Sequence, residues 1–276
     1  MDVRSLAFRT DLALLTLGGS VVTDHGDHLV VRTPDNPTFW WGNFLLLAAP
    51  PTVPELDGWL DRFAAEHPGA QHVALGFDGT SPAGAEALIE HLQSPGRGFT
   101  VETTTAMTAV AVHPPPRPNQ DVTVHTLETD EDWEQSVAVR LACDADETDV
   151  DHGPADQHRH FVTTRTGTYR RLVEDGNARW FGGFLGDRLV SQLGLVRADG
   201  DVARFQSVET VPEARGQGIA GTLVHHASQV GLTEMDARTL VMCADPDYLA
   251  IRLYRSVGFR DTETQLQATR RPVHSS

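Results

Sequence analysis

The segment that decides the fold of this chain is VETVPEARGQGIA, residues 208–220. An apolar run bounded by Gly200 and Pro212 leads into it, and this pattern predicts a strand. Apolar residues at helical spacing follow it and predict an amphipathic helix; they are Leu223, Val224, Ala227 and Val230. The segment therefore runs from a strand through a glycine-containing turn into a helix.

The turn has the chemistry of an anion-binding site. Pro212 ends the strand because it cannot donate a ladder hydrogen bond, while Gly216 and Gly218 let a ligand approach the backbone. The first N–H groups of a helix lack intrahelical partners and lie at the positive end of its dipole. Here they belong to Gln217, Gly218, Ile219 and Ala220. The pattern predicts a pyrophosphate site.

Two other phosphate-binding motifs do not fit this turn. A Rossmann loop needs a third glycine at the dinucleotide spacing, and a P-loop needs Gly-Lys-Ser/Thr. The turn has neither, and its crossover lies late in the domain rather than at its start.

Two motifs in this order are similar to those of the GCN5-related N-acetyltransferases (GNAT). Motif A of that family, Arg/Gln-x-x-Gly-x-Gly/Ala, is matched by Arg215, Gly218 and Ala220. The segment DYLAIRLYRSVGF, residues 247–259, looks like motif B, in which a helix carrying Ala-x-x-Leu-Tyr ends at Gly-Phe. The resemblance covers residues 120–270 in outline and is sharpest between 205 and 260.

The resemblance implies an enzyme that moves an acetyl group from acetyl-CoA to a primary amine of a small molecule, peptide or protein. Transfer is expected to be direct, in a ternary complex. The backbone of Val208, Glu209 and Thr210 would pair with the pantetheine arm, and residues 216–221 would hold the pyrophosphate. The residues implied in cofactor binding are Val208, Glu209, Thr210, Arg215, Gly216, Gln217, Gly218, Ile219, Ala220, Gly221 and Asp247. Tyr254 would protonate the departing thiolate, and no metal is expected.

Two positions depart from the family pattern. Asp247 stands where many relatives carry Asn; it can accept a hydrogen bond from the pantetheine amide but cannot donate one, and it adds negative charge beside an anionic cofactor. Met242 stands where some protein-acetylating relatives place a glutamate base. Glu209 is the remaining candidate base, with an ion-paired strand residue as the structural alternative. Attack by a neutral amine, or deprotonation through water, stays open.

A proline-rich seam divides the chain. Residues 112–120, VHPPPRPNQ, oppose helix and sheet alike, which predicts domains at 1–117 and 118–276. The later part of each half has the order strand, helix, strand, helix, strand. The expected fold class is therefore α/β (α+β), with two GNAT-like domains, each a mixed, largely antiparallel sheet flanked by helices.

Hydrophobic periodicity predicts the individual elements. In the first half we expect helices at 5–16, 54–66 and 83–93, and strands at 28–33, 39–48, 71–77 and within 98–112. In the second half we expect helices at 130–143, 155–173, 217–231 and 246–257. The expected strands there are 122–127, 178–185, 188–197, 202–211, 238–244 and 259–268.

The first half is predicted to be a degenerate copy that binds no CoA. Its counterpart of the cofactor strand would be WWGNFLLL, residues 40–47, and residues 48–54 carry three prolines where an anion site needs free N–H donors. Trp40 and Trp41, as successive strand residues, would face opposite sides, one into the core and one free for an interface. We expect this half to pack on the catalytic one and to wall its acceptor pocket.

Composition excludes several classes of function. A formal charge of −16, from 22 Lys and Arg against 38 Asp and Glu, disfavours nucleic acid as a partner. Cys143 and Cys243 are the only cysteines, which suits a reducing, cytoplasmic compartment and packing roles rather than nucleophilic ones. The apolar run at 12–17 has no signal-peptide cleavage pattern, and no stretch reaches the roughly 20 apolar residues that a membrane helix needs.

The remaining polar clusters have simple explanations. The acidic stretch 144–152 is interpreted as a solvated loop, with attraction of a cationic amine as the alternative. His152, His158 and His160 near Asp156 fit no common zinc spacing and are interpreted as a polar loop. Rival functions are a mycothiol synthase-like tandem acetyltransferase and a non-catalytic module that senses acetyl-CoA. The acceptor, the acyl-chain preference and the oligomeric state, a homodimer included, stay open.

Overall fold

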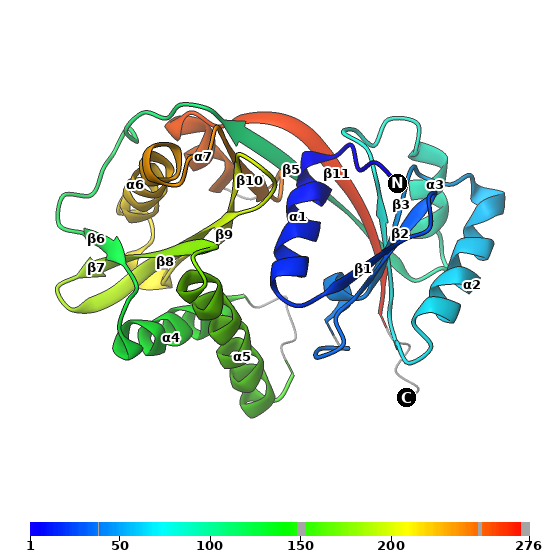
Figure 1. Cartoon of the computed structure of the whole chain (residues 1–276), viewed down its shortest axis with the longest axis horizontal. Helices are drawn as coiled ribbons and strands as arrows, with labels where there is room; N and C mark the ends of the chain where they lie inside the picture. The colour runs from blue at the N-terminus through cyan, green and yellow to red at the C-terminus, as the bar shows by residue number, and fades with distance from the viewer. Residues whose placement is uncertain (38, 148–152, 248–249, 272–276) are drawn as a thin grey trace. The chain divides into compact units, whose positions relative to one another are not determined.

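The computed structural model describes the whole chain except residues 38, 148–152, 248–249 and 272–276. The described residues divide into two compact units. The first comprises residues 1–107, 243–247 and the chain from Asp261 onward, and the second comprises residues 108–242 and a stretch that ends at Arg260. In each unit a sheet is covered by helices (Figure 1).

The first unit is built on a mixed sheet of strand order β1-β2-β3-β4-β11-β5. Its strands are β1 Val21–Asp24, β2 His28–Arg32, β3 Phe44–Leu47, β4 Val73–Phe77, β5 Phe99–Ala109 and β11 Arg260–Arg270. Its helices are α1 Leu6–Leu17, α2 Leu56–Glu66 and α3 Glu86–Gln93. The pairs β1–β2, β2–β3 and β4–β11 are antiparallel, whereas β3 and β4 are parallel. A parallel pair needs a crossover connection, and α2 supplies it.

Strand β3 shows how this sheet holds helices on both faces. Every residue of Phe44–Leu47 is buried, and successive strand residues point to opposite faces. Leu45 and Leu47 join the core cluster of α2 and α3, while Phe44 and Leu46 join the cluster of α1. Burial of both faces explains why this stretch is a continuous apolar run rather than an alternating one.

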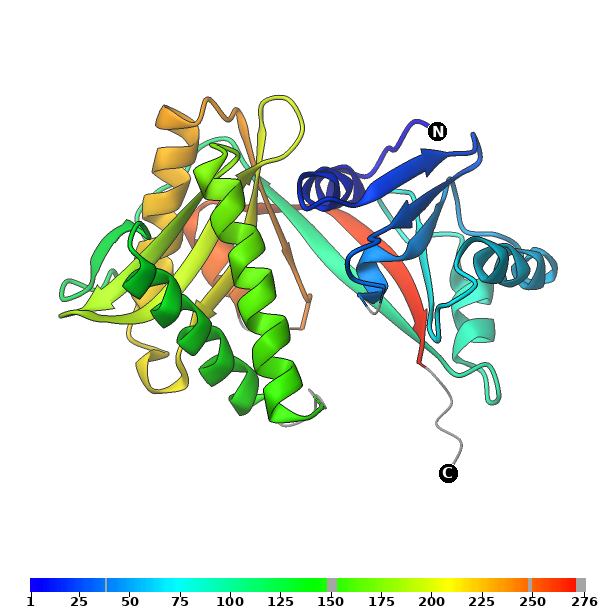
Figure 2. The same cartoon turned by 60° about the horizontal axis from the view of Figure 1, so that its bottom comes forward.

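The second unit is built on a sheet of order β10-β9-β8-β7-β6. Its strands are β6 Thr123–Thr126, β7 Ala178–Leu185, β8 Arg188–Arg197, β9 Val202–Thr210 and β10 Thr239–Ala244, and its helices are α4 Asp130–Asp146, α5 Ala155–Glu174, α6 Ile219–Glu234 and α7 Ala250–Val257. Strands β6 to β9 pair antiparallel, and β10 runs parallel to β9. Helices α4 and α5 cover one face of this sheet, and α6, packed with α7, covers the other (Figures 1 and 2). Among the described helices of either unit, none is both long and apolar enough to cross a membrane.

The two units share one order of elements. The order is β1-β2-β3-α2-β4 in the first unit and β7-β8-β9-α6-β10 in the second, with two antiparallel pairs followed by a parallel one in each. The predicted fold class, a mixed and largely antiparallel sheet flanked by helices, is confirmed. Strand β1 had no sequence prediction, and the predicted helix 246–257 includes residues 248–249, outside the described residues.

The strand prediction for Trp40 and Trp41 is wrong. Both lie in a 3-10 turn of residues 40–42, and β3 starts only after it. Asn43 holds this turn, because its side-chain amide donates to two backbone carbonyls. Trp40 stacks on His72 with ring centroids 5.6 Å apart, and Trp41 meets the first ring of β3 edge-on at 5.5 Å. Strand alternation therefore does not apply, and both indoles are half-buried within their own unit.

The predicted C-terminal strand is present as β11, but it belongs to a different unit from the one expected. Leu266–Arg270 of β11 pair antiparallel with Val73–Phe77 of β4, so the chain from Asp261 is part of the first unit. The compact units are thus not the linear segments 1–117 and 118–276. The pairing joins strands from opposite ends of the chain, which local periodicity does not record.

Candidate active site

Strand β9 is bulged where the predicted site begins. Gln192 of β8 pairs with Glu209, but Gly194 pairs with Gln206, so two residues of β9 stand opposite one residue of β8. Ser207 lies in this bulge with a φ of 49°, in the left-handed region that few non-glycine residues adopt. A bulge changes the direction in which the following side chains of its strand point.

Strand β9 pairs with the parallel strand β10 before the bulge. The pairing of β9 with β10 covers Val202–Arg204 and Thr239–Val241, and the described residues show no further pair between these two strands. Among the described residues of this unit, Glu209 and Thr210 therefore pair with β8 alone, and Val208 lies in the bulge. The backbone of residues 208–210 is the part of the strand predicted, from the family resemblance, to pair with pantetheine.

A tight turn joins β9 to α6. Residues 212–214 form a 3-10 turn, Gly216 and Gly218 have φ values of 74° and 82°, and α6 begins at Ile219. The Thr222 N–H donates to the Gly218 carbonyl at 3.1 Å as the first bond of the helix. The N–H groups of residues 219–221 precede that bond and lie at the positive end of the helix. The predicted strand, turn and helix are all present.

The proline-rich segment packs against this turn, which the sequence does not reveal. Asn119 donates its backbone N–H to Thr222 Oγ1 and its side-chain N–H to the Gln217 carbonyl, both at 2.9 Å. A Cβ placed at Gly218 would lie 2.1 Å from the Arg117 carbonyl oxygen. Glycine is therefore required at position 218 by its backbone conformation and also by the space available.

The exposed side chain of Arg215 stabilises the turn. Its Nε donates to the Thr210 carbonyl at 3.0 Å, and its guanidinium pairs with Asp146 at the end of α4 at 2.5 Å. Gln217 is also exposed, and its side chain donates to the Glu213 carbonyl at 3.0 Å. These side-chain contacts hold the turn in shape.

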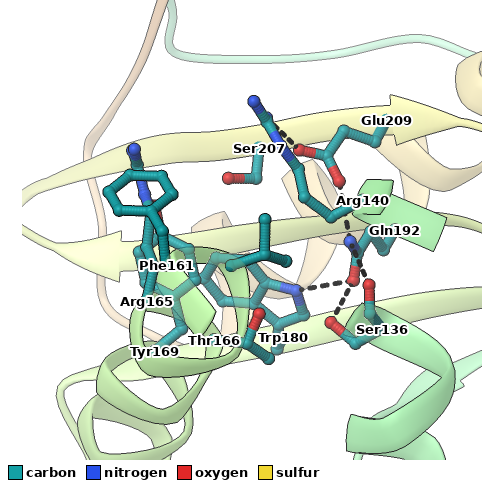
Figure 3. Close-up of a pocket in the computed structure, with 11 residues that line it drawn as sticks. Ser136, Arg140, Phe161, Arg165, Thr166, Tyr169, Trp180, Gln192, Ser207 and Glu209 are labelled. Carbon is teal, nitrogen blue, oxygen red and sulfur yellow. Dashed lines mark hydrogen bonds and ion pairs between the residues drawn. The ribbon is translucent and has the colours of Figure 1, made fainter. Parts of the chain in front are cut away.

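A pocket opens beside the bulge (Figure 3). It encloses about 320 Å³, part of it open to solvent. Its lining comes from α4, α5 and strands β7 to β9, and consists of Ser136, Arg140, Phe161, Val162, Arg165, Thr166, Tyr169, Trp180, Gln192, Ser207 and Glu209. Tyr169 stacks on Trp180 with ring centroids 4.3 Å apart, so part of the wall is aromatic. A different part carries the charged pair Arg140 and Glu209 (Figure 3).

The Glu209 carboxylate is buried and held on both oxygens. Its residue is 8% exposed; Oε1 accepts from Arg140 at 2.7 Å and Oε2 accepts from Gln192 Nε2 at 2.7 Å. Gln192 is fixed in turn, since its own Oε1 accepts from Ser136 Oγ at 2.5 Å. Burial raises the pKa of Glu209 above its ordinary value, although Arg140 and Gln192 act in the opposite direction. The structural alternative of an ion-paired strand residue is thus realised, in a carboxylate that also faces the pocket.

Arg140 contacts a second buried carboxylate. Its other terminal nitrogen lies 2.8 Å from Asp144 Oδ1, one helical turn along α4, and Asp144 is 2% exposed. The second oxygen of Asp144 lies 2.8 Å from His158 Nε2 on α5. His158 thus pairs with a carboxylate of the same unit, and the described residues contain no group of three or more His, Cys, Asp or Glu suited to a metal ion. Asp156, His158 and His160 of that sequence cluster lie in α5 rather than in a polar loop, and His152 lies outside the described residues.

Residues 142–259 match the model of the family described as the acetyltransferase (GNAT) family. The chain carries a GNAT domain. The match includes the bulged end of β9, the turn and both predicted motifs, and it lies almost wholly in the second unit. No curated protein matches the sequence.

Several solved structures are similar to nearly the whole chain, and two of the three described below are GNAT proteins. A functionally unknown conserved protein from Staphylococcus epidermidis is 14% identical, with a TM-score of 0.68 and coverage of 91% of this chain and 93% of its own. A GCN5-related N-acetyltransferase from Kribbella flavida is 18% identical, with a TM-score of 0.65 and coverage of 98% of both chains. A tandem GNAT protein from the clavulanic acid biosynthesis pathway is 13% identical, with a TM-score of 0.54, covering 95% of this chain and 89% of its own. The likeness establishes a GNAT-like fold for the N-terminal part as well.

In the GNAT domain, Tyr254 is a buried residue of α7. It is 6% exposed and shares the buried face of the helix with Ile251 and Val257. The helix ends at Gly258, whose φ is 119°, and the Phe259 N–H donates back to the Tyr254 carbonyl at 3.1 Å. The Gly-Phe of motif B thus serves as the helix stop that fixes Tyr254, whose catalytic role stays a prediction.

Other predicted residues have different surroundings. Asp247 is exposed, its N–H donates to Asp245 Oδ1 at 2.8 Å, and it falls within residues 243–247 of the first unit rather than in the GNAT unit. Cys143 is buried with its thiol 3.5 Å from the Thr210 carbonyl, and burial raises its pKa to about 11. It is therefore a protonated, packed thiol at neutral pH rather than a nucleophile.

The first unit builds the corresponding turn differently. After β3 the chain enters a 3-10 turn, Val53–Glu55, that leads into α2. Glu55 folds back so that its carboxylate accepts from the N–H and the hydroxyl of Thr52, both at 2.8 Å. A carboxylate of the chain itself thus occupies the start of this helix region.

Several site residues were missed from the sequence, namely Arg140, Gln192 and Asp144. Arg140 lies on the predicted helix 130–143, and Asp144 was interpreted as the start of a solvated acidic loop, whereas the structure buries it in α4. The two residues are four apart, which is the spacing of a helical ion pair. That spacing could have paired them with each other. It could not have placed them beside Glu209, because this contact joins α4 to β9.

Proposed function

We propose that this chain is an N-acetyltransferase that moves an acetyl group from acetyl-CoA to a primary amine of a small molecule or peptide. The observation that carries the proposal is the arrangement at the end of β9. Within four residues this strand contributes Ser207 and Glu209 to the pocket, presents an edge without a parallel neighbour, and enters the turn of α6. Acceptor pocket and cofactor strand would thus adjoin each other.

The residues of the turn fit a CoA pyrophosphate. The N–H groups of residues 219–221 come before the first helical bond, and the left-handed Gly216 and Gly218 expose the backbone around them. Backbone groups of residues 208–210 would pair with the pantetheine amides. The cofactor would supply a thioester, which is reactive toward amines. Asp247 would accept a hydrogen bond from a pantetheine amide but could not donate one.

Two side chains would handle protons. Attack of the amine nitrogen on the thioester carbon forms a C–N bond and breaks the C–S bond, so one proton must leave nitrogen and one must reach sulfur. We propose that the Glu209 carboxylate takes the proton from the amine nitrogen, directly or through a water. Its burial and raised pKa make it a better base than an exposed glutamate. We propose that the Tyr254 hydroxyl donates the proton that reaches the sulfur.

Binding of the cofactor can be tested with a matched pair of charge changes. Gln217→Glu places a carboxylate in the exposed turn, and Gln229→Glu makes the same change on the exposed face of α6 far along the helix. In calorimetric titration with acetyl-CoA we expect Gln217→Glu to weaken binding about tenfold, equivalent to ~1.4 kcal/mol, and Gln229→Glu to leave it unchanged. Equal effects of the two changes would remove the turn as the binding site.

Turnover separates an enzyme from a sensor. Acetyl-CoA is incubated with the full-length protein and a panel of amines and short peptides, and release of the free thiol is followed. We expect release that depends on the acceptor. Tight acetyl-CoA binding with no acceptor-dependent release across the panel would instead identify a binding module.

A further inference from the structure

Arg140 lies between two buried carboxylates. One terminal nitrogen is 2.7 Å from Glu209 Oε1 and the other is 2.8 Å from Asp144 Oδ1. Glu209 and Asp144 are only 8% and 2% exposed, whereas the arginine side chain is 38% exposed. Figure 3 shows the Arg140 end of this arrangement, with the guanidinium directed at Glu209. One cation is therefore shared by two anions in a poorly solvated place.

The charges of this cluster do not balance by themselves. Two carboxylates against one guanidinium leave one negative charge. Asp144 has a further partner in His158, whose Nε2 is 2.8 Å from its second oxygen. Buried charges are costly unless they are paired. The contacts thus form a chain in the order His158, Asp144, Arg140, Glu209.

The other groups that face Glu209 are few. From α4 it also meets Cys143, which stays a neutral thiol, and from β8 it meets the uncharged Gln192. From α5 the pocket is lined by Arg165, which is tied to Tyr169 by a hydrogen bond of 2.6 Å. Arg215 pairs with Asp146 outside the chain of contacts. Arg140 is thus the cation in direct contact with Glu209, and Asp144 is its competitor.

We propose that Asp144 and His158 are positioning residues that determine how firmly Arg140 holds the Glu209 carboxylate. The proposal rests on the proposed function only in treating Glu209 as the base; the contacts themselves are independent of it. Neither residue lines the pocket. Both act through Arg140, Asp144 by drawing the guanidinium away from Glu209 and His158 by satisfying Asp144.

This arrangement makes two substitutions act in opposite directions. Asp144→Asn removes a negative charge and leaves Arg140 to Glu209, so Glu209 should ionise at lower pH. His158→Phe removes the partner of Asp144, which then competes more strongly for Arg140, so Glu209 should ionise at higher pH. Each shift should be on the order of one pH unit, the size produced by a neighbouring buried charge. A purely structural role would predict loss of stability for both, with no opposite shifts.

The test is a carbon-13 NMR titration of the full-length protein labelled at the glutamate carboxyl carbons. The Glu209 signal is assigned by its absence in Glu209→Gln. Asp156→Asn is the matched control, since it removes the same charge from an exposed position of α5 two residues from His158. We expect opposite shifts for Asp144→Asn and His158→Phe, and no shift for the control.

The titration tests the proposal whether or not the protein catalyses acetyl transfer. Shifts in the same direction, or none in either variant, overturn the proposal even if acetyl transfer is observed. Opposite shifts support it even if no acceptor is found, in which case only the proposed function fails. If Asp144→Asn does not fold, His158→Phe decides alone, because an upward shift supports the proposal and an unchanged titration rejects it.

Discussion

The Arg117 carbonyl oxygen occupies space that any side chain at Gly218 would need, since a Cβ there would lie 2.1 Å away. The proline-rich segment is therefore not a loose linker where it passes α6. With Asn119 bonded to Gln217 and Thr222, it forms one wall of the turn that we assign to the pyrophosphate. The shape of the turn depends on residues about 100 positions earlier in the sequence.

Replacing Gly218 should be much more harmful than replacing Gly216. Both have positive φ, which costs an alanine ~1 kcal/mol, but only position 218 lacks space, because nothing lies within 4 Å of a Cβ at Gly216. We expect Gly218→Ala to lower the free energy of unfolding by about 3 kcal/mol and Gly216→Ala by ~1 kcal/mol. Urea unfolding of the two variants measures this difference, and equal losses would show that the contact with Arg117 is unimportant.

Glu209→Gln should separate chemistry from cofactor binding. The amide keeps the shape and can still contact Gln192, but it cannot take a proton. We expect kcat to fall by about 10²–10⁴ with little change in the acetyl-CoA dissociation constant. An unchanged kcat would favour attack by an amine that is already neutral.

The pH dependence of the wild type gives a second measurement on Glu209. A base works only when deprotonated, and burial raises the pKa of this carboxyl above 4.5. The value of kcat/KM should therefore fall as the pH is lowered through that raised pKa, and Glu209→Gln should lose this acidic limb. A limb that persists in the variant would have to come from another group.

Tyr254→Phe tests the proposed acid. The ring stays buried in α7, so we expect a thermal midpoint close to that of the wild type and a kcat lowered by about 10². Where acetyl transfer is not the rate-limiting step, kcat would not show a slower transfer. Single-turnover rates, which report the transfer step itself, are therefore the appropriate measurement. Wild-type single-turnover rates in the variant would show that water or another group protonates the thiolate.

His67 in the first unit should make stability depend on pH. Burial lowers its pKa from 6.5 to about 4, so below pH 6.5 the unfolded chain binds a proton that the folded chain excludes. Stability should therefore fall as the pH drops from 6.5 toward 4, by ~2 kcal/mol for this residue. Urea unfolding at several pH values should show a smaller loss in His67→Leu than in the wild type, with His160→Gln, exposed on α5, as the control.

The sequence by itself determined the local elements and the kind of site. The structure of residues 202–234 is determined largely by local sequence. An apolar run, a proline that ends the strand, two glycines and a helical repeat each fix the conformation of the neighbouring backbone. The same local logic led to the GNAT motifs and to Glu209 as a candidate. It failed at Trp40 and Trp41, where the Asn43 side chain stabilises a turn that residue propensity alone does not indicate.

Only the tertiary structure decided the contacts between distant segments. The pairing of β11 with β4, the packing of Arg117 on Gly218 and the sharing of Arg140 between Asp144 and Glu209 each join elements that are far apart in the chain. Such contacts depend on how whole elements stack, and their strength depends on burial, which one sequence does not record. The sequence therefore predicted a set of cofactor-binding residues, and the fold decided which residues surround the candidate base.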